Sequence, residues 1–187
     1  NLAKLAEKCG RKDLSIYVAK NAYRDSNQIL KLGYPTINLP YQKDLNKALI
    51  FALIRQESAF NSNAKSFAGA LGLMQLMPLT AKQVSIANNI PYIRESLTKD
   101  KEYNMILGTW FLSNLVQKFD GSYALALAAY NAGPSRVKKW IKEFGDPRLD
   151  EIEIVDWIET IPFKETRNYI QRVIESKNVY DFLLEKN

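Results

Sequence analysis

Apolar residues recur three and four positions apart through most of the chain, which is the spacing of one face of an α-helix. Gly and Pro interrupt this pattern and mark where elements end. The predicted helices cover residues 2–9, 12–29, 43–58, 78–88, 101–118, 150–160 and 165–184, together with 122–141, which bends at Gly133-Pro134. Short strands fit only around residues 68–76. The pattern therefore predicts a mainly α fold of the α+β type with a small antiparallel sheet.

The segment KLGYPTINLPYQ, residues 31–42, interrupts the helical pattern near the N-terminus. It contains Gly33, Pro35 and Pro40, which favour extended, non-helical backbone. We interpret it as a boundary between an N-terminal helical region, residues 1–40, and a second domain, residues 41–187.

Glu57 stands out within the helix predicted over residues 43–58, because it falls in line with Ile50 and Ile54. At about 100° per residue it projects within about 20° of Ile50, close to the apolar face. Loss of hydration raises the pKa of a carboxyl group, and the partial negative charge at a helix C-terminus acts in the same direction. Arg55 points elsewhere on the helix and is not an expected partner. Periodicity does not decide between such a tuned general acid and a solvated residue at a frayed helix end.

The stretch SFAGALGLMQLMP follows Glu57 and offers groups that suit a binding cleft. Gly69 and Gly72 let backbone approach a ligand closely, while Ser66 and Gln75 offer hydrogen bonds and Met77 a soft apolar surface. The alternative is an ordinary glycine-containing hairpin packed on the core.

A second candidate stretch is AAYNAGP, residues 128–134, at the end of an Ala-rich helix. Its small side chains allow close packing, and Tyr130 can present its hydroxyl at the edge of a cleft. The alternative is a core tyrosine whose hydroxyl is bonded internally.

Composition narrows the chemistry further. The 187 residues are 47% hydrophobic and 25% charged, which is typical of a globular protein, and they include no histidine and one cysteine. The missing histidines exclude Ser-His-Asp and Cys-His catalysis and His-ligated zinc, and a lone cysteine excludes thiolate metal clusters. We therefore expect neither a metal nor a cofactor. Acid–base chemistry would depend on a carboxyl group, a lysine or a tyrosine.

The net charge of +6 comes from basic residues that are mostly scattered singly, apart from RVKKWIK at residues 136–142. They form no stripe with interleaved aromatic residues, so we expect no binding to nucleic acid. No apolar run reaches the ~18 residues of a membrane span. The chain has no initiator Met and no signal-peptide pattern. We interpret it as a processed or trimmed fragment whose targeting sequence lies outside it.

Four motifs in order give the chain a family resemblance: ES at residues 57–58, GLMQLMP, AYNAG and IPFKETRNY. From residue 43 to about residue 184 it resembles the catalytic domain of the soluble lytic transglycosylases, whose fold is similar to goose-type lysozyme. Residues 1–40 resemble the end of the helical superhelix that precedes this domain in larger members.

The resemblance implies that Glu57 is the only catalytic acid and base. It also implies that the substrate is contacted by five residues: Ser66, Gln75, Met77, Tyr130 and Glu165. The implied substrate is the glycan strand of peptidoglycan, cut at the β-1,4 bond between N-acetylmuramic acid and N-acetylglucosamine, with a 1,6-anhydro ring as product. The substrate in turn implies a periplasmic location, and other cell-wall enzymes are candidate partners.

Glu165 is the second carboxylate to consider. KETRNY opens a helix after Pro162, and a helix N-terminus stabilises the anion of a glutamate. We therefore expect Glu165 to position the substrate, through Arg167 or the peptide stem of the sugar, rather than to donate a proton.

Two other classes of function remain open at this point. A hydrolase of the same fold would release reducing sugar ends. A non-catalytic glycan-binding module would bind strands without turnover.

Overall fold

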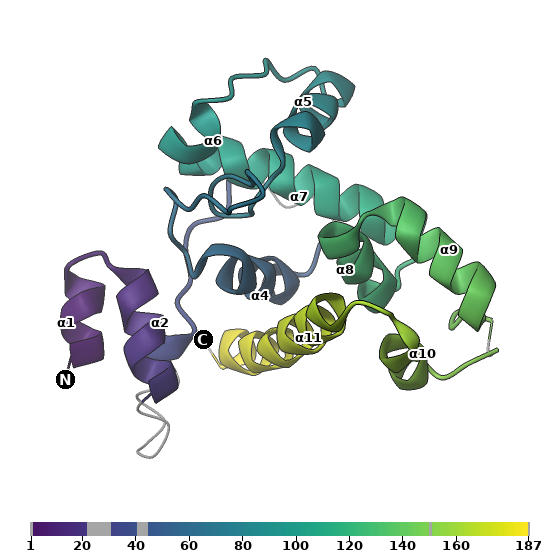
Figure 1. The fold of residues 1–187 in the computed structure, drawn as a ribbon. Coiled ribbons are helices and arrows are strands. Elements are labelled where there is room, and N and C mark those ends of the chain that lie inside the picture. The colour runs from purple at the N-terminus through teal and green to yellow at the C-terminus, as the bar shows by residue number, and fades with distance from the viewer. Residues whose placement is uncertain (1, 22–30, 41–44, 150, 187) are drawn as a thin grey trace.

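The computed structural model describes residues 2–21, 31–40, 45–149 and 151–186, and helices form most of it (Figure 1). The helices are α1 (Leu2–Lys8), α2 (Lys12–Asn21), α4 (Lys47–Ser58), α5 (Pro78–Ala87), α6 (Ser96–Lys99), α7 (Lys101–Lys118), α8 (Tyr123–Ala132), α9 (Pro134–Phe144), α10 (Ile154–Thr160) and α11 (Lys164–Glu185). None of the helices in the described ranges is both long and apolar enough to cross a lipid bilayer.

Most predicted helices are confirmed, with differences at their ends. α4 begins at Lys47 because the side chain of Asn46 accepts a hydrogen bond from the backbone N–H of Leu49 and caps the helix. The chain bends between α8 and α9 at Gly133, whose φ of 93° favours glycine. The prediction that residues 31–42 are non-helical is wrong for residues 31–33, which are helical. Residues 22–29 of the second predicted helix and 41–44 lie outside the described residues.

The predicted small sheet is not formed by the described residues. Around residues 68–76 the chain makes turns, with only isolated antiparallel bridges, Lys65 with Leu71 and Leu71 with Leu76. Gly69 and Gln75 adopt positive φ values of 90° and 46°, and such residues turn the chain back before a strand extends. The segment is therefore a compact loop, and we call residues 61–77 the Gln75 loop.

α4 is the central helix of the core. It packs beside α11, and α8 packs against α11, α7 and α9 (Figure 1). All seven residues of α4 from 48 to 54 are buried, so neighbouring elements cover α4 on every side there. α4 thereby carries its last turn, with Glu57, to the boundary between the core and the Gln75 loop.

A smaller apolar cluster lies between α5, α6 and α7. Its buried members are Leu76, Ala81, Val84, Leu97 and Leu107. Leu76 belongs to the Gln75 loop, so this cluster fixes the loop on the side away from α4.

The residues before α4 are bound to the same core. The backbone carbonyl of Gly33 accepts a hydrogen bond from Arg55 Nε at 2.8 Å, and that of Pro35 accepts one from the Tyr180 hydroxyl at 2.8 Å. Ser15 of α2 donates in turn to the carbonyl of Leu32 at 3.0 Å. α2 is therefore joined to α4 and α11 through residues 32–35.

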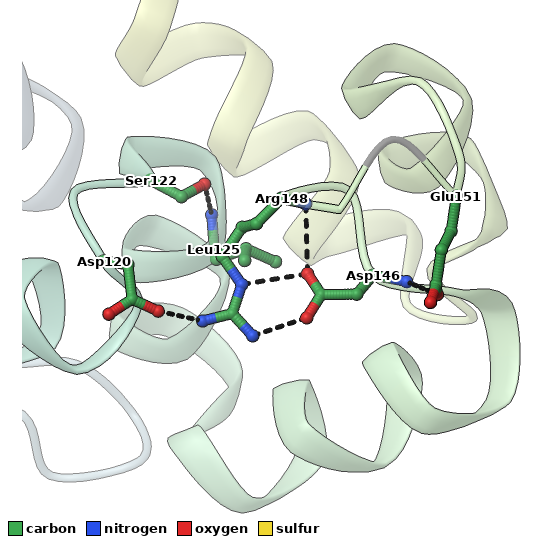
Figure 2. A network of polar contacts seen from close by, with 6 residues as sticks. All are labelled: Asp120, Ser122, Leu125, Asp146, Arg148 and Glu151. Carbon is green, nitrogen blue, oxygen red and sulfur yellow. Dashed lines mark hydrogen bonds and ion pairs between the residues drawn. The ribbon is translucent and has the colours of Figure 1, made fainter.

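A charged cluster ties the turn after α7 to the loop before α10, and we call it the Arg148 clasp (Figure 2). Arg148 donates to Asp120 at 2.6 Å and to both carboxylate oxygens of Asp146, at 2.9 and 2.6 Å. Glu151 accepts a hydrogen bond from the backbone N–H of Asp146 at 2.7 Å. A bidentate arginine–carboxylate pair of this kind fixes geometry as well as charge.

Candidate active site

Glu57 lies in the last turn of α4, where the helix ends at Ser58 and Ala59 turns the chain with a φ of 49°. Its side chain is partly buried, and its Oε1 accepts a hydrogen bond of 2.6 Å from the hydroxyl of Tyr169 on α11. The predicted position beside the apolar face is therefore confirmed. The alternative of a solvated residue at a frayed end is wrong.

No lysine or arginine of the described residues is a cause of the pKa shift of Glu57. Burial raises the pKa of Glu57 from 4.5 to about 7, the hydrogen bond from Tyr169 opposes this rise, and the charge of Glu165 adds to it. Arg55 points away, as predicted: it donates to Gly33 and Ser176 and lies 4.1 Å from the centre of the Tyr34 ring. Glu57 is therefore a carboxyl group that retains its proton close to neutral pH.

Two tyrosines lie near Glu57, Tyr169 buried and Tyr130 partly buried. Burial raises the pKa of Tyr130 and of Tyr169 well above the usual value, and the negative charge of Glu57 adds to both shifts. Both phenols therefore stay protonated and serve as donors, Tyr169 to Glu57 and Tyr130 to the carbonyl of Met74 at 2.7 Å. Both sequence interpretations of Tyr130 hold in part, because its hydroxyl is bonded internally while its side chain lines a pocket.

Side chains from three helices hold the Gln75 loop. Ser58 of α4 donates to the carbonyl of Leu73 at 2.8 Å, and Tyr130 of α8 bonds Met74. Asn104 of α7 is fully buried: its Oδ1 accepts from the N–H of Met74 at 2.9 Å and its Nδ2 donates to the carbonyl of Leu71 at 2.9 Å. The loop beside Glu57 is thus held in one conformation without a sheet.

Asn104 is not among the residues predicted from the sequence, although the sequence carries a signal for it. Gly108 follows Asn104 by one helical turn, and a Cβ at Gly108 would lie 2.4 Å from the sulfur of Met74. A glycine inside a predicted helix marks such a close approach. An amide one turn before it then lies on the same face, where it reaches the loop backbone.

Three of the five predicted contact residues come together around one pocket of about 250 Å³. Gln75, Met77 and Tyr130 line it. The other lining residues are Leu76, Thr80, Phe111, Ala129, Asn131, Ala132, Gly133 and Pro134. Glu57 does not line this pocket, but Tyr130 lies between the two, since its phenol lines the pocket and interacts with the charge of Glu57.

Ser66 lies apart from this pocket, in an exposed turn of the Gln75 loop. Its hydroxyl accepts a hydrogen bond from the N–H of Ala70 at 2.9 Å. Gly69 has open space around it, as expected of a glycine at a cleft. For Gly72 that expectation is wrong, because a Cβ there would lie 2.0 Å from the carbonyl oxygen of Leu97. Gly72 is required for packing within the protein and not for contact with a ligand.

Glu165 lies exposed in the first turn of α11. It is close enough for its charge to raise the pKa of Glu57. Arg167, the expected intermediary, is bound to the carbonyl of Ile161 and lies 3.9 Å from Glu159. No described contact joins Arg167 to Glu165.

A hydrogen bond that was not predicted from the sequence fixes the start of α11 against the pocket. The hydroxyl of Thr166, 1% exposed, donates to Oδ1 of Asn131 at 2.7 Å. Asn131 lines the pocket, so this bond sets the distance between the pocket and the first turn of α11.

Two other aspartates have structural roles and a third is exposed. Asp100 caps α7 by accepting from the N–H groups of Glu102 and Tyr103, Asp120 belongs to the Arg148 clasp, and Asp156 is exposed on α10. Within the described part of the chain, no three His, Cys, Asp or Glu side chains gather as metal ligands would.

Comparison with protein families agrees with this geometry. The family model described as "Transglycosylase SLT domain" matches residues 36–152. Curated relatives include the soluble lytic murein transglycosylase of Salmonella typhimurium, 40% identical over 71% of this chain, and that of Escherichia coli, 37% identical over 76%.

Two solved structures of lytic transglycosylases are similar in fold to nearly the whole chain. It is similar to an inactive mutant of the lytic transglycosylase Slt from Pseudomonas aeruginosa, with a TM-score of 0.83 and 36% identity over 98% of the chain. It is also similar to the 70-kDa soluble lytic transglycosylase of Escherichia coli, with a TM-score of 0.85 and 32% identity over 98%. The chain spans 20% and 22% of the two curated relatives and 30% of each solved chain.

Proposed function

The chain belongs to the transglycosylase SLT domain family, and from this premise we propose that it is a peptidoglycan lytic transglycosylase. It would cut the β-1,4 bond between N-acetylmuramic acid and N-acetylglucosamine and leave a 1,6-anhydro ring. The observation that carries this proposal is the state of Glu57: a partly buried carboxyl group with a pKa of about 7 and no cationic partner among the described residues.

In the first step Glu57 is the acid. It gives its proton to the glycosidic oxygen while the bond from that oxygen to the anomeric carbon of the muramic sugar breaks. Positive charge develops on that carbon, and the N-acetyl carbonyl of the substrate stabilises it, as in other glycosidases that lack a second catalytic carboxylate. The N-acetylglucosamine side leaves with a 4-hydroxyl group.

In the second step Glu57, now ionised, is the base. It takes the proton from the 6-hydroxyl of the muramic sugar, whose oxygen bonds to the anomeric carbon and closes the anhydro ring. This closure is unimolecular and consumes no water, and it returns the proton to Glu57. A carboxyl group with a pKa near neutrality suits both directions of transfer. The hydroxyl of Tyr169, 2.6 Å from Oε1, orients the group throughout.

Glu165 is the only other carboxylate whose charge bears on Glu57 in the described structure. It lies exposed in the first turn of α11. We assign it to positioning the substrate. Gln75, Met77 and Tyr130 would contact the glycan in the pocket, and Ser66 would contact it from the exposed turn.

The decisive experiment is the mass of the products. Purified sacculi are digested with the protein, and the released muropeptides are measured by mass spectrometry. We expect fragments with anhydro ends, each lighter by one water than the fragments with reducing ends that a hydrolase would release. Reducing ends alone would replace the proposal with a lysozyme-type hydrolase, and tight binding without products would replace it with a binding module.

The proposal extends to the setting of the chain. Murein is a polymer of the bacterial cell envelope, so we propose action in the periplasm, and we propose other cell-wall enzymes as partners. We also propose that residues 1–40 end a preceding helical region. The contacts of residues 32–35 with α4 and α11 support this assignment, because they fix the region against residues 41–187.

A further inference from the structure

Helix α9 has two faces of opposite character. Val137 and Trp140 are buried on one face, and Ile141 and Phe144 pack beside them. The other face is exposed and cationic, and it carries Arg136, Lys138, Lys139 and Lys142. We call these four residues the α9 basic face. Glu143 is the only acidic residue of the helix.

The α9 basic face adjoins the candidate site. α9 begins at Pro134, and Gly133 and Pro134 line the pocket. Arg136 donates to the carbonyl of Ala132, another lining residue, at 2.9 Å. The cationic surface therefore starts within one helical turn of the pocket wall.

An aromatic side chain extends the surface toward Glu165. The guanidinium of Arg136 lies 5.3 Å from the ring centre of Phe163, which makes an edge contact with Trp140 at 5.5 Å between centres. Phe163 caps α11, whose first turn carries Glu165. Arg136, in the first turn of α9, is thereby held over the aromatic ring of Phe163.

Among the described residues, no ion pair neutralises the charges of the α9 basic face. None of its four residues takes part in a described ion pair, and Glu143 does not either. Like charges gathered on one helix face repel one another, so an anionic ligand would relieve this repulsion as well as add attraction.

We propose that the α9 basic face binds the carboxylates of the peptide stems carried by the glycan strand. This inference rests on the proposed function. The N-acetylated sugars of such a strand are neutral, and its negative charge resides on the stems that branch from the muramic units. A strand held in the pocket beside Gly133 and Pro134 therefore brings a stem to the one neighbouring surface of this helix that complements it.

The test compares two triple variants of equal charge. Lys138→Gln/Lys139→Gln/Lys142→Gln removes most of the α9 basic face and leaves Arg136, which bonds Ala132, in place. The control Lys8→Gln/Lys47→Gln/Lys118→Gln removes three exposed lysines of α1, α4 and α7. Both are made in a Glu57→Gln background, so that binding is measured without turnover.

The ligands are soluble glycan strands with intact stems and oligosaccharides of N-acetylglucosamine of the same length, which carry no stem and no carboxylate. Exposed ion pairs contribute little one by one, so we expect the three substitutions together to weaken binding to stem-bearing strands by about 3- to 30-fold. Affinity for the neutral oligosaccharides should not change, the control should match the unsubstituted background, and the difference should shrink at high salt. Equal affinities of the two triple variants for stem-bearing strands would overturn the inference, as would an equal loss on the neutral oligosaccharides.

Two further outcomes separate the alternatives. Vesicles of phosphatidylglycerol and phosphatidylcholine test a membrane surface as the partner. If the α9 triple variant loses only vesicle binding, the inference is wrong and the face is a lipid contact. Turnover of sacculi by the unsubstituted protein is measured in parallel. If the unsubstituted protein releases products and the α9 triple variant binds strands with unaltered affinity, this inference alone is overturned. If the unsubstituted protein releases no products and no strand binding is seen, the proposed function is overturned with it.

Discussion

Glu57, in the last turn of α4, and Asp146, just after α9, are two carboxyl groups withdrawn from water. They differ in the groups that donate hydrogen bonds to them. Asp146, 8% exposed, receives three hydrogen bonds from Arg148, two of them from the guanidinium, and these bonds hold the pKa of Asp146 below its usual value. Glu57 receives one hydrogen bond, from the neutral phenol of Tyr169, and burial raises its pKa to about 7.

The comparison shows that the partner, and not burial alone, decides the protonation state of a withdrawn carboxyl group. A cation with bidentate geometry fixes Asp146 as an anion, which suits a structural connection. A neutral donor leaves the proton of Glu57 exchangeable near neutral pH, which suits transfer to and from a substrate. Substitutions at the two places should therefore affect different properties.

The largest effect should come from Glu57→Gln on activity. Removal of the only group that exchanges a proton with the substrate should lower kcat by about 1,000-fold or more, since general acid–base catalysis contributes about 10²–10⁴-fold for each transfer. Release of muropeptides from sacculi measures it. Asp146→Asn is the matched control and should leave kcat within about twofold in protein that remains folded. Comparable losses in the two variants would remove the functional side of the comparison.

The next effect should be on stability, from Arg148→Gln. Without the guanidinium, the withdrawn carboxylate of Asp146 loses charged hydrogen bonds, and the free energy of unfolding should fall by about 1–3 kcal/mol in chemical denaturation at pH 7. The contribution of Asp146 should be fully present above about pH 4 and should be lost as pH falls further, because between the lowered pKa of the folded state and the usual value near 4 the unfolded chain binds more protons than the folded protein.

Arg11→Gln is the control for this stability effect. Arg11 pairs with Asp13 on the surface, where its side chain is 57% exposed, so its loss should change the free energy of unfolding by less than about 0.5 kcal/mol. An equal cost for Arg11 and Arg148 would mean that the Arg148 clasp is an ordinary surface ion pair.

Glu57→Gln should have the opposite sign on stability. Because the pKa of Glu57 is raised from 4.5 to about 7, the folded protein binds more protons than the unfolded chain between these values. The free energy of unfolding of the unsubstituted protein should therefore fall as pH rises through that range. The variant lacks this loss and should be more stable by about 1–3 kcal/mol at pH 8, with a difference near zero at pH 4. A constant difference across this range would contradict a raised pKa.

The smallest effect should come from Tyr169→Phe. This hydrogen bond favours the anion of Glu57, so its loss should raise the pKa of Glu57 further and move the alkaline limb of the kcat/KM profile to higher pH. Tyr180→Phe, which removes a buried hydroxyl bonded to Pro35 instead, should leave the limb in place. A shift to lower pH in Tyr169→Phe would mean that the hydroxyl stabilises the protonated acid.

Most of the helices and the position of Glu57 were predictable because both depend on local periodicity. Ile50 and Ile54 mark the buried side of α4, and the direction of Glu57 follows from counting residues along one helix. The family of the chain was predictable from four short motifs in order, which the match to residues 36–152 supports.

The Gln75 loop was not predictable in the same way, because distant residues decide its conformation. Short strands were predicted around residues 68–76, but Asn104 on α7 and Tyr130 on α8 satisfy backbone groups that a sheet would otherwise pair. Tyr169 lies 112 positions from Glu57 along the chain, and its contact depends on how α11 packs beside α4. Sequence periodicity places residues on helix faces but does not pair one helix with another.

The most direct test of the central claim is a titration of Glu57 itself. Carbon-13 NMR of protein labelled at glutamate side chains would follow the carboxyl resonance of Glu57, assigned by its absence in Glu57→Gln. We expect a midpoint near pH 7, well above the value of about 4.3 that is usual for a glutamate side chain. A midpoint at or below about 4.5 would mean that Glu57 is an ordinary carboxylate at neutral pH, and the account of its acid role would be wrong.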